Sequence, residues 1–128
     1  MAVKIKNRAT TVERQNQVAV LRERLEEFTD TLDESEVAYI TAKWDGYSER
    51  NALLIAMQHP GATDVAGFRA WLGRGRCVRK GEKSIHILAP AGQGEVTDEN
   101  GEVQPGRLRF KLAYLFDIEQ TVPLEASP

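Results

Sequence analysis

Apolar side chains near the start of the chain recur at helical spacing. They stand three or four residues apart, at Val18, Leu21, Leu25, Phe28 and Leu32. Side chains at these steps share one face of an α-helix, so the pattern predicts a helix over residues 11–32. Thr10 and Glu13 have the spacing of a capping box at its start, and residues 1–10 are predicted to form a flexible arm.

Two shorter helices are predicted next, each bounded by turn residues. The first runs over residues 35–44 and is closed by the turn Asp45-Gly46. Three of its residues are expected to face inward: Val37, Ala38 and Ile40. The second begins after Ser48, whose hydroxyl suits an N-cap, and ends before Pro60. Its sequence ALLIAMQ is apolar on nearly every side, so this helix is predicted to be buried.

Alternating apolar and polar residues predict strands in the second half of the chain. Residues 84–88 form one such segment, and the clearest strand is residues 107–116. Its apolar positions are expected to face the helices: Leu108, Phe110, Leu112, Tyr114 and Phe116. The other set is expected on the opposite face: Arg107, Arg109, Lys111, Ala113 and Leu115. Residues 91–106 suit a polar loop or an extended hairpin tip around Asn100-Gly101.

These elements predict an α+β fold, with three to four helices packed on one face of a small antiparallel β-sheet. The 128 residues suit one domain, expected over residues 11–122, with a frayed tail at 123–128. The composition, 41% hydrophobic and 28% charged, is that of a soluble globular protein. Neither a membrane-spanning run nor a secretory signal is visible, and the lone Cys77 excludes an internal disulfide, so a cytoplasmic location is expected.

Positive charge is concentrated in one segment, although the formal net charge of the chain is −2. Residues 67–90 carry one acid, Glu82, against these bases: Arg69, Arg74, Arg76, Arg79, Lys80 and Lys83. Phe68 and Trp71 stand among them. Cations that follow phosphates and rings that stack on bases are features of single-stranded nucleic-acid sites. Trp71 is therefore a candidate stacking platform, although its spacing from Phe68 equally suits a buried helical face.

Negative charge gathers earlier in the chain. Between Glu23 and Glu49 there are nine acids against two bases, Arg24 and Lys43. Such a run forms either a solvated helical face or a surface that imitates DNA. The second interpretation gives an alternative function, that of an acidic protein-interaction or DNA-mimic domain that binds a host restriction enzyme.

The sequence does not predict an enzyme. Residues 75–84 contain the residue types of a phosphate-binding loop, but Glu82 interrupts the required Gly-Lys pair and a strand is expected to follow. His59 and His86 are the only histidines, and together with one cysteine they do not form a zinc-ligand pattern. We therefore expect no cofactor, no metal and no catalytic residue.

Residues around the third predicted helix are further candidates for nucleic-acid binding. Arg50 and Asn51 stand in its first turn, where free backbone N–H groups favour a phosphate, although Asn51 equally suits helix capping. Tyr47 pairs with Trp44 beside the preceding turn, either as packing or as a base platform. Gln58, near the end of the helix, would satisfy a backbone group or read a base edge.

Several of these residues recur in strings that together are specific. The strings are Tyr47-Ser48-x-Arg50-Asn51-x-Leu53-Leu54, Gln58-x-Pro60-x-Ala62-Thr63, Val65-x-Gly67-Phe68-x-x-Trp71, Gly75-Arg76-x-Val78-x-Lys80-Gly81-Glu82-Lys83, Ile87-Leu88-Ala89-Pro90 and Phe116-Asp117-Ile118-x-Gln120-Thr121. Over roughly residues 12–123 the chain resembles the N-terminal domain of ArdC-type antirestriction proteins. The resemblance implies a single-stranded-DNA-binding module of plasmids, phages and related mobile elements, often placed ahead of a zinc-dependent protease-like domain. That second domain is not expected here, because the sequence has no His-Glu-x-x-His.

Carried over position by position, the resemblance implies that the shared polar and aromatic residues are Tyr47, Arg50, Asn51, Gln58, Trp71, Arg76, Lys80 and Lys83. The leading hypothesis is a non-catalytic module that binds single-stranded DNA with little sequence preference. In it, phosphates are neutralised by Arg74, Arg76, Lys80 and Lys83. Trp71 or Tyr47 stacks on a base, and Arg50 and Asn51 hold a phosphate or sugar. A restriction or replication protein is the other expected partner, and a membrane is not expected.

Overall fold

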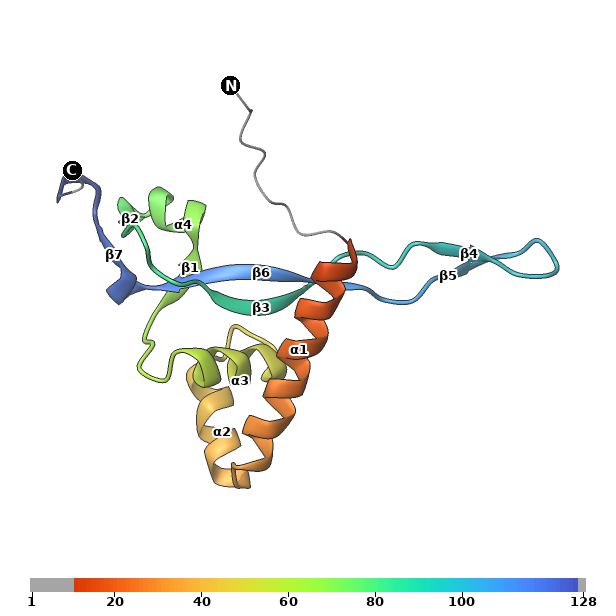
Figure 1. The fold of residues 1–128 in the computed structure, drawn as a ribbon, viewed down its shortest axis with the longest axis horizontal. Helices are drawn as coiled ribbons and strands as arrows, with labels where there is room; N and C mark the ends of the chain where they lie inside the picture. Colours follow the sequence, from red (N-terminus) through yellow and green to blue (C-terminus); the bar gives the residue numbers. More distant parts are fainter. Residues whose placement is uncertain (1–10, 127–128) are drawn as a thin grey trace.

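The computed structural model describes residues 11–126, and its chain folds into four α-helices and three small antiparallel sheets (Figure 1). The helices are α1 (Thr11–Asp30), α2 (Glu34–Lys43), α3 (Glu49–Gln58) and the short α4 (Phe68–Gly73). The predicted α+β class is confirmed. The proposed arm at 1–10, with the cap at Thr10, and the end of the tail at 127–128 lie outside the described residues.

The three N-terminal helices follow the patterns in the sequence closely. Leu21 and Leu25 of α1 are buried in the core, as the apolar stripe predicts. Helix α2 begins at a capping box between Asp33 and Glu36, and its Val37 and Ile40 are partly buried against the core. Ala38 is exposed instead, because it falls on the outer side of α2, so its inward placement was wrong.

Helix α3 is the centre of the core. The hydroxyl of Ser48 accepts a hydrogen bond from the backbone N–H of Asn51 at 3.1 Å and caps the helix, as predicted. Its interior is buried at Ala52, Leu53, Leu54 and Ile55. The helix ends at the C-cap His59, directly before Pro60.

The main sheet has the strand order β1–β6–β3, and all pairs are antiparallel. Its strands are β1 (Val65–Gly67), β6 (Phe110–Asp117) and β3 (Ile85–Pro90). Figure 1 shows α3 beside β3 and α4 on the other side of the sheet, next to β1. Helices therefore lie on both sides of this sheet, whereas the sequence predicted one covered face.

This arrangement overturns the predicted facing of β6. Leu115 is in the buried core, and Tyr114, which was expected to face the helices, is 52% exposed. Leu115 pairs with the buried Ile85 across the sheet, and this places both side chains on the core. Phe110 and Leu112 are partly buried against the same core, so β6 does not have one apolar and one polar face along its whole length.

Two small sheets complete the fold. Strand β2 (Arg76–Val78) pairs with β7 (Thr121–Pro123), and the 3-10 helices η1 (Ile118–Gln120) and η2 (Leu124–Ala126) flank β7. The tail was predicted to fray from residue 123, but its described part forms regular structure. The backbone N–H of Leu124 donates to the carbonyl of Gly75 at 2.9 Å and holds this part of the tail against the fold. Strands β4 (Glu95–Thr97) and β5 (Val103–Pro105) form the expected hairpin, which extends away from the body (Figure 1).

Candidate nucleic-acid interface

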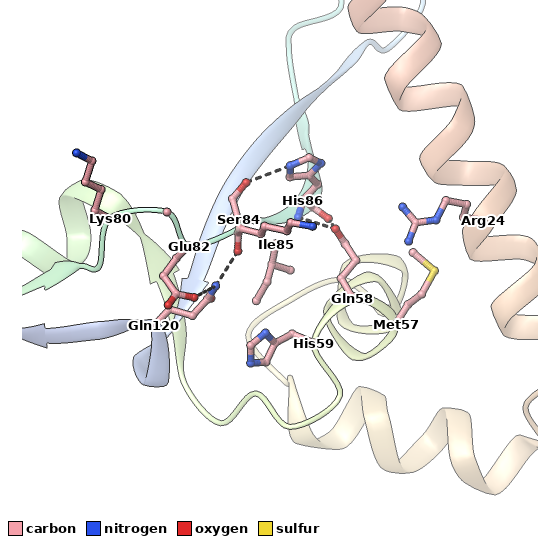
Figure 2. Close-up of a pocket in the computed structure, with 12 residues that line it drawn as sticks. Arg24, Met57, Gln58, His59, Lys80, Glu82, Ser84, Ile85, His86 and Gln120 are labelled. Atoms are coloured by element: carbon pink, nitrogen blue, oxygen red, sulfur yellow. Dashed lines mark hydrogen bonds between the residues drawn. The ribbon is translucent and has the colours of Figure 1, made fainter.

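A groove of about 920 Å³ lies between α1, the end of α3 and the segment that leads into β3 (Figure 2). Three side chains with a permanent positive charge line it: Arg24, Lys80 and Lys83. Figure 2 shows Arg24 at one end of the groove and Lys80 at the other. Glu82 is the one carboxylate among the lining residues, so the groove carries net positive charge.

The charge of these three cations is not neutralised inside the described part of the chain. Arg24, Lys80 and Lys83 are exposed, and no carboxylate of residues 11–126 lies within 4.0 Å of their charged atoms. Glu82 pairs with Arg79 instead, at 3.3 Å. An extended anion could therefore meet several free cations along one groove.

The loop that carries the two lysines is held by a buried amide. The Nε2 group of Gln120 donates to the carbonyl of Lys83 at 2.7 Å, while its Oε1 accepts from the backbone N–H of Asp117 at 2.8 Å. Gly81 has a φ of 86°, a left-handed conformation that favours glycine at the tip of this turn. The positions of Lys80 and Lys83 are thus set by the fold. Gln120 had no predicted role in the site.

His86 forms the polar wall of the groove. Its Nε2 lies 3.1 Å from the hydroxyl of Ser84, and its ring meets the ring of Tyr114 edge to face, with centroids 5.0 Å apart. Burial, and then the charge of Arg24, lower the pKa of His86 below its ordinary value, so the imidazole is neutral at pH 7. Neither His86 nor Tyr114 was among the predicted site residues, because only the strand pairing brings them together.

Asn51 and Gln58 form hydrogen bonds with the backbone of β3, at the edge of the sheet. Asn51 donates to the carbonyl of Leu88 and accepts from its N–H, both at 2.9 Å. Gln58 forms the same pair of bonds with the backbone of His86, at 2.7 and 2.9 Å. The two amides of α3 therefore replace a neighbouring strand along β3. Of the two roles considered for Gln58, the satisfaction of a backbone group is confirmed. Asn51 reaches β3 with its side chain, so the amide group that was expected to hold a phosphate or sugar is already occupied.

Alanine at either amide is expected to lower the free energy of unfolding by about 1–3 kcal/mol, because a backbone donor and acceptor of β3 lose their partners. Urea denaturation of Asn51→Ala and Gln58→Ala measures the loss. Gln93→Ala, which removes an exposed amide from the segment between β3 and β4, is the control and should change stability little. Equal stability of all three variants would contradict the role of the amides at this edge.

Trp71 is not a stacking platform. Its side chain is 1% exposed, and its indole N–H donates to the carbonyl of Phe116 at 2.8 Å. The guanidinium of Arg74 covers the ring at 4.8 Å. The expectation of an exposed ring was therefore wrong at Trp71, because α4 turns this side of its short apolar face onto the sheet. Phe68 is the exposed member of the pair.

Three other predicted residues are also engaged in the fold. Arg74 pairs with Asp64 at 3.3 Å, and the Nε of Arg76 donates to the hydroxyl of Thr121 at 2.7 Å. Tyr47 is half-buried, and burial raises the pKa of its hydroxyl. None of the three lines the groove. The structure thus brings only Lys80, Lys83 and Gln58 of the predicted set together.

Arg50 lies over the ring of Phe110, with its guanidinium carbon 4.4 Å from the ring centroid. It does not line the groove either. Arg24 is the cation that sequence reasoning missed. It stands in the acidic run, and only the packing of α1 against the sheet brings it to the groove.

One cluster within the described residues has the chemistry to hold a metal ion. Ligand atoms of His59, Asp117 and Glu119 lie within 4.8 Å of one another. Burial alone would raise the pKa of Asp117, but the backbone N–H groups of Thr63, Asp64 and Glu119 donate to it, and with His59 they lower the pKa. The carboxylate thus caps two turns, which accounts for its burial, and we assign no ion to it.

Comparison with known proteins gives a family for most of the chain. The family described as the N-terminal domain of anti-restriction factor ArdC matches residues 10–116. The crystal structure of the antirestriction protein ArdC from plasmid R388, in metal-free form, is similar at 20% identity and a TM-score of 0.47. The match covers 69% of this chain and 40% of that one. No curated protein matches the sequence. Within the described residues, no helix combines the length and apolar character that a membrane span requires.

Proposed function

Because this chain belongs to the family of the N-terminal domain of anti-restriction factor ArdC, we propose that it binds single-stranded DNA with little sequence preference and without catalysis. The observation that carries the proposal is the groove between Arg24 and the Lys80–Lys83 loop, in which free cations outnumber the single, already paired carboxylate. Phosphates of a flexible strand would lie along these cations, and this type of contact does not depend on base sequence.

The aromatic surface next to the groove is Tyr114. Its ring is half exposed and touches His86, which lines the groove. Base stacking on an exposed ring contributes about 1–3 kcal/mol per base and accepts any base. In the proposal, Tyr114 therefore takes the stacking role that the sequence analysis gave to Trp71 or Tyr47.

The dependence of affinity on salt tests this proposal. Contacts to about three to five phosphates of a single strand predict a slope of log affinity against log salt of roughly −2 to −3.5. Fluorescence anisotropy of a dye-labelled poly-dT strand measures this slope, and a duplex and an RNA of equal length give the preference. Binding that is indifferent to salt, or no binding at low salt, would overturn the proposal.

We further propose that strand binding serves antirestriction on a mobile element, a plasmid or a phage. The family, described as the N-terminal domain of anti-restriction factor ArdC, supports this assignment. This chain spans 40% of the length of the plasmid R388 protein. The test is protection of unmodified DNA from a restriction enzyme in cells that express this chain alone, and equal restriction with and without the chain would contradict it.

An acidic surface, formed by the acids between Glu23 and Glu49, supports a second candidate function. All nine acids between Glu23 and Glu49 are exposed, along the second half of α1, α2, the turn that follows and the first residue of α3. Such a surface suits a basic protein partner, such as a restriction or replication protein. This second function predicts that the chain binds a basic protein, and that this binding persists when the cations of the groove are replaced.

A further inference from the structure

Two arginines from different helices share one aromatic ring at the start of β6. The guanidinium carbon of Arg50 lies 4.4 Å from the ring centroid of Phe110, and that of Arg22 lies 5.5 Å from it. The two carbons are thus at most 9.9 Å apart, the sum of these distances. Cation–π attraction to Phe110 holds two like charges together here.

The positive charge of this pair is uncompensated within residues 11–126. No carboxylate of this part of the chain lies within 4.0 Å of either guanidinium, and Glu49, next to Arg50 in sequence, is exposed without an ion pair. The pKa of Arg50 is lowered by burial and then by the charge of Arg22.

Arg50 also has a donor without an acceptor. Its Nε is buried and has no hydrogen-bond partner. A buried N–H that lacks a partner is costly, and the two terminal nitrogens of this guanidinium, which are not buried in this way, are the donors that a phosphate can reach. Arg50 stands in the first turn of α3, a ten-residue helix whose N-terminus also favours an anion.

We propose that Arg22 and Arg50, held over Phe110, form a phosphate-binding site outside the groove. Arg24, two residues after Arg22, lines the groove, so α1 carries one cation for each of the two sites. Figure 1 shows α1 crossing the sheet where β6 begins. The phosphate is expected to belong to the same single strand of DNA that lies in the groove, and this assignment rests on the proposed function. The other source is free phosphate.

Two measurements with the full chain test this site. In the first, inorganic phosphate is compared with chloride at equal ionic strength, and the shift of the melting temperature is recorded. We expect phosphate to stabilise the wild-type chain more than Arg22→Gln or Arg50→Gln. Arg14→Gln, which removes an exposed arginine from the same helix, is the matched control and should keep the wild-type response.

In the second measurement, labelled poly-dT is titrated with the same variants. We expect Arg22→Gln and Arg50→Gln each to weaken binding about tenfold and to make the salt slope shallower by about 0.7, the value for one phosphate contact. A phosphate effect with unchanged poly-dT affinity supports the site and assigns it to free phosphate. A phosphate response equal in wild-type and variants, together with unchanged poly-dT affinity, would overturn the site.

The test of the Arg22–Arg50 site can fail or succeed independently of the test of the proposed function. If the wild-type chain does not bind poly-dT, the proposed function fails, while the phosphate measurement still decides on the arginine pair. Conversely, Lys80→Glu with Lys83→Glu should lose poly-dT binding and keep the stabilisation by phosphate, because neither lysine belongs to the pair.

Discussion

Replacing Lys80 and Lys83 together by glutamate is expected to weaken binding of single-stranded DNA by about a hundredfold or more. Each lysine loses a charge-assisted contact with a phosphate, and each new carboxylate repels the strand in the same groove. The loop itself should keep its shape, because Gln120 holds it through the carbonyl of Lys83 and not through the side chain. Anisotropy titration with labelled poly-dT measures the loss.

The control changes the net charge by the same amount elsewhere. Arg69 and Arg107 are exposed and do not line the groove, so Arg69→Glu with Arg107→Glu should weaken binding far less. An equal loss in both double variants would mean that net charge, and not the groove, governs binding. If the lysine variants no longer bind single-stranded DNA but still bind a basic partner protein, the acids between Glu23 and Glu49 form a separate binding surface.

Trp71→Ala is expected to lower the free energy of unfolding by about 3–5 kcal/mol, the largest loss of stability foreseen for one substitution. The ring is fully buried between α4 and β6, and its removal leaves a cavity as well as an unpaired carbonyl at Phe116. Since small domains have about 5–15 kcal/mol of stability, this change removes a large fraction of it. Urea denaturation followed by circular dichroism measures the difference.

Trp71→Phe separates packing from a direct role in binding. It keeps an aromatic ring in the core but loses the hydrogen bond to Phe116, so we expect a smaller loss of about 1–2 kcal/mol. The folded variant should bind poly-dT with the affinity of the wild-type chain. A marked loss of affinity at full folding would contradict the structural role and restore Trp71 as a contact with DNA.

Much of the fold follows from local patterns in the sequence. The stripe through Leu21 and Leu25, the cap at Ser48 and the hairpin around Asn100-Gly101 depend on neighbours a few residues away, and all are present in the structure. The facing of β6 could not be predicted in the same way. Its alternation predicts one covered face, but elements from both sides of the sheet pack against it.

The candidate site was harder to predict because the same side chain can serve the fold or a ligand. Asn51 and Gln58 have the chemistry of base-reading amides, yet the edge of β3 needs their hydrogen bonds. Arg74 and Arg76 are cations in the basic segment, yet their partners are inside the chain. Residue type alone does not distinguish these roles, because partners such as Leu88 and Thr121 are distant in sequence.

The groove also depends on a contact between distant segments. Arg24 belongs to a helix with many acids, and nothing near it in the sequence links it to Lys80 or Lys83. Packing of α1 and α3 against the sheet brings the three cations to one surface. What the sequence did indicate is the free charge of the Lys80–Lys83 turn, and these two lysines remain the predicted contacts at the centre of the proposal.

Chemical-shift mapping tests most directly whether a single strand occupies the groove. An isotope-labelled sample of the 128-residue chain is titrated with a short poly-dT strand, and the backbone amide signals are followed. We predict the largest changes at the amides of residues 80–86 and of Arg24, with the amide of Tyr114 also affected. Changes confined to the acidic residues of α1 and α2, or to the hairpin of β4 and β5, would contradict the account.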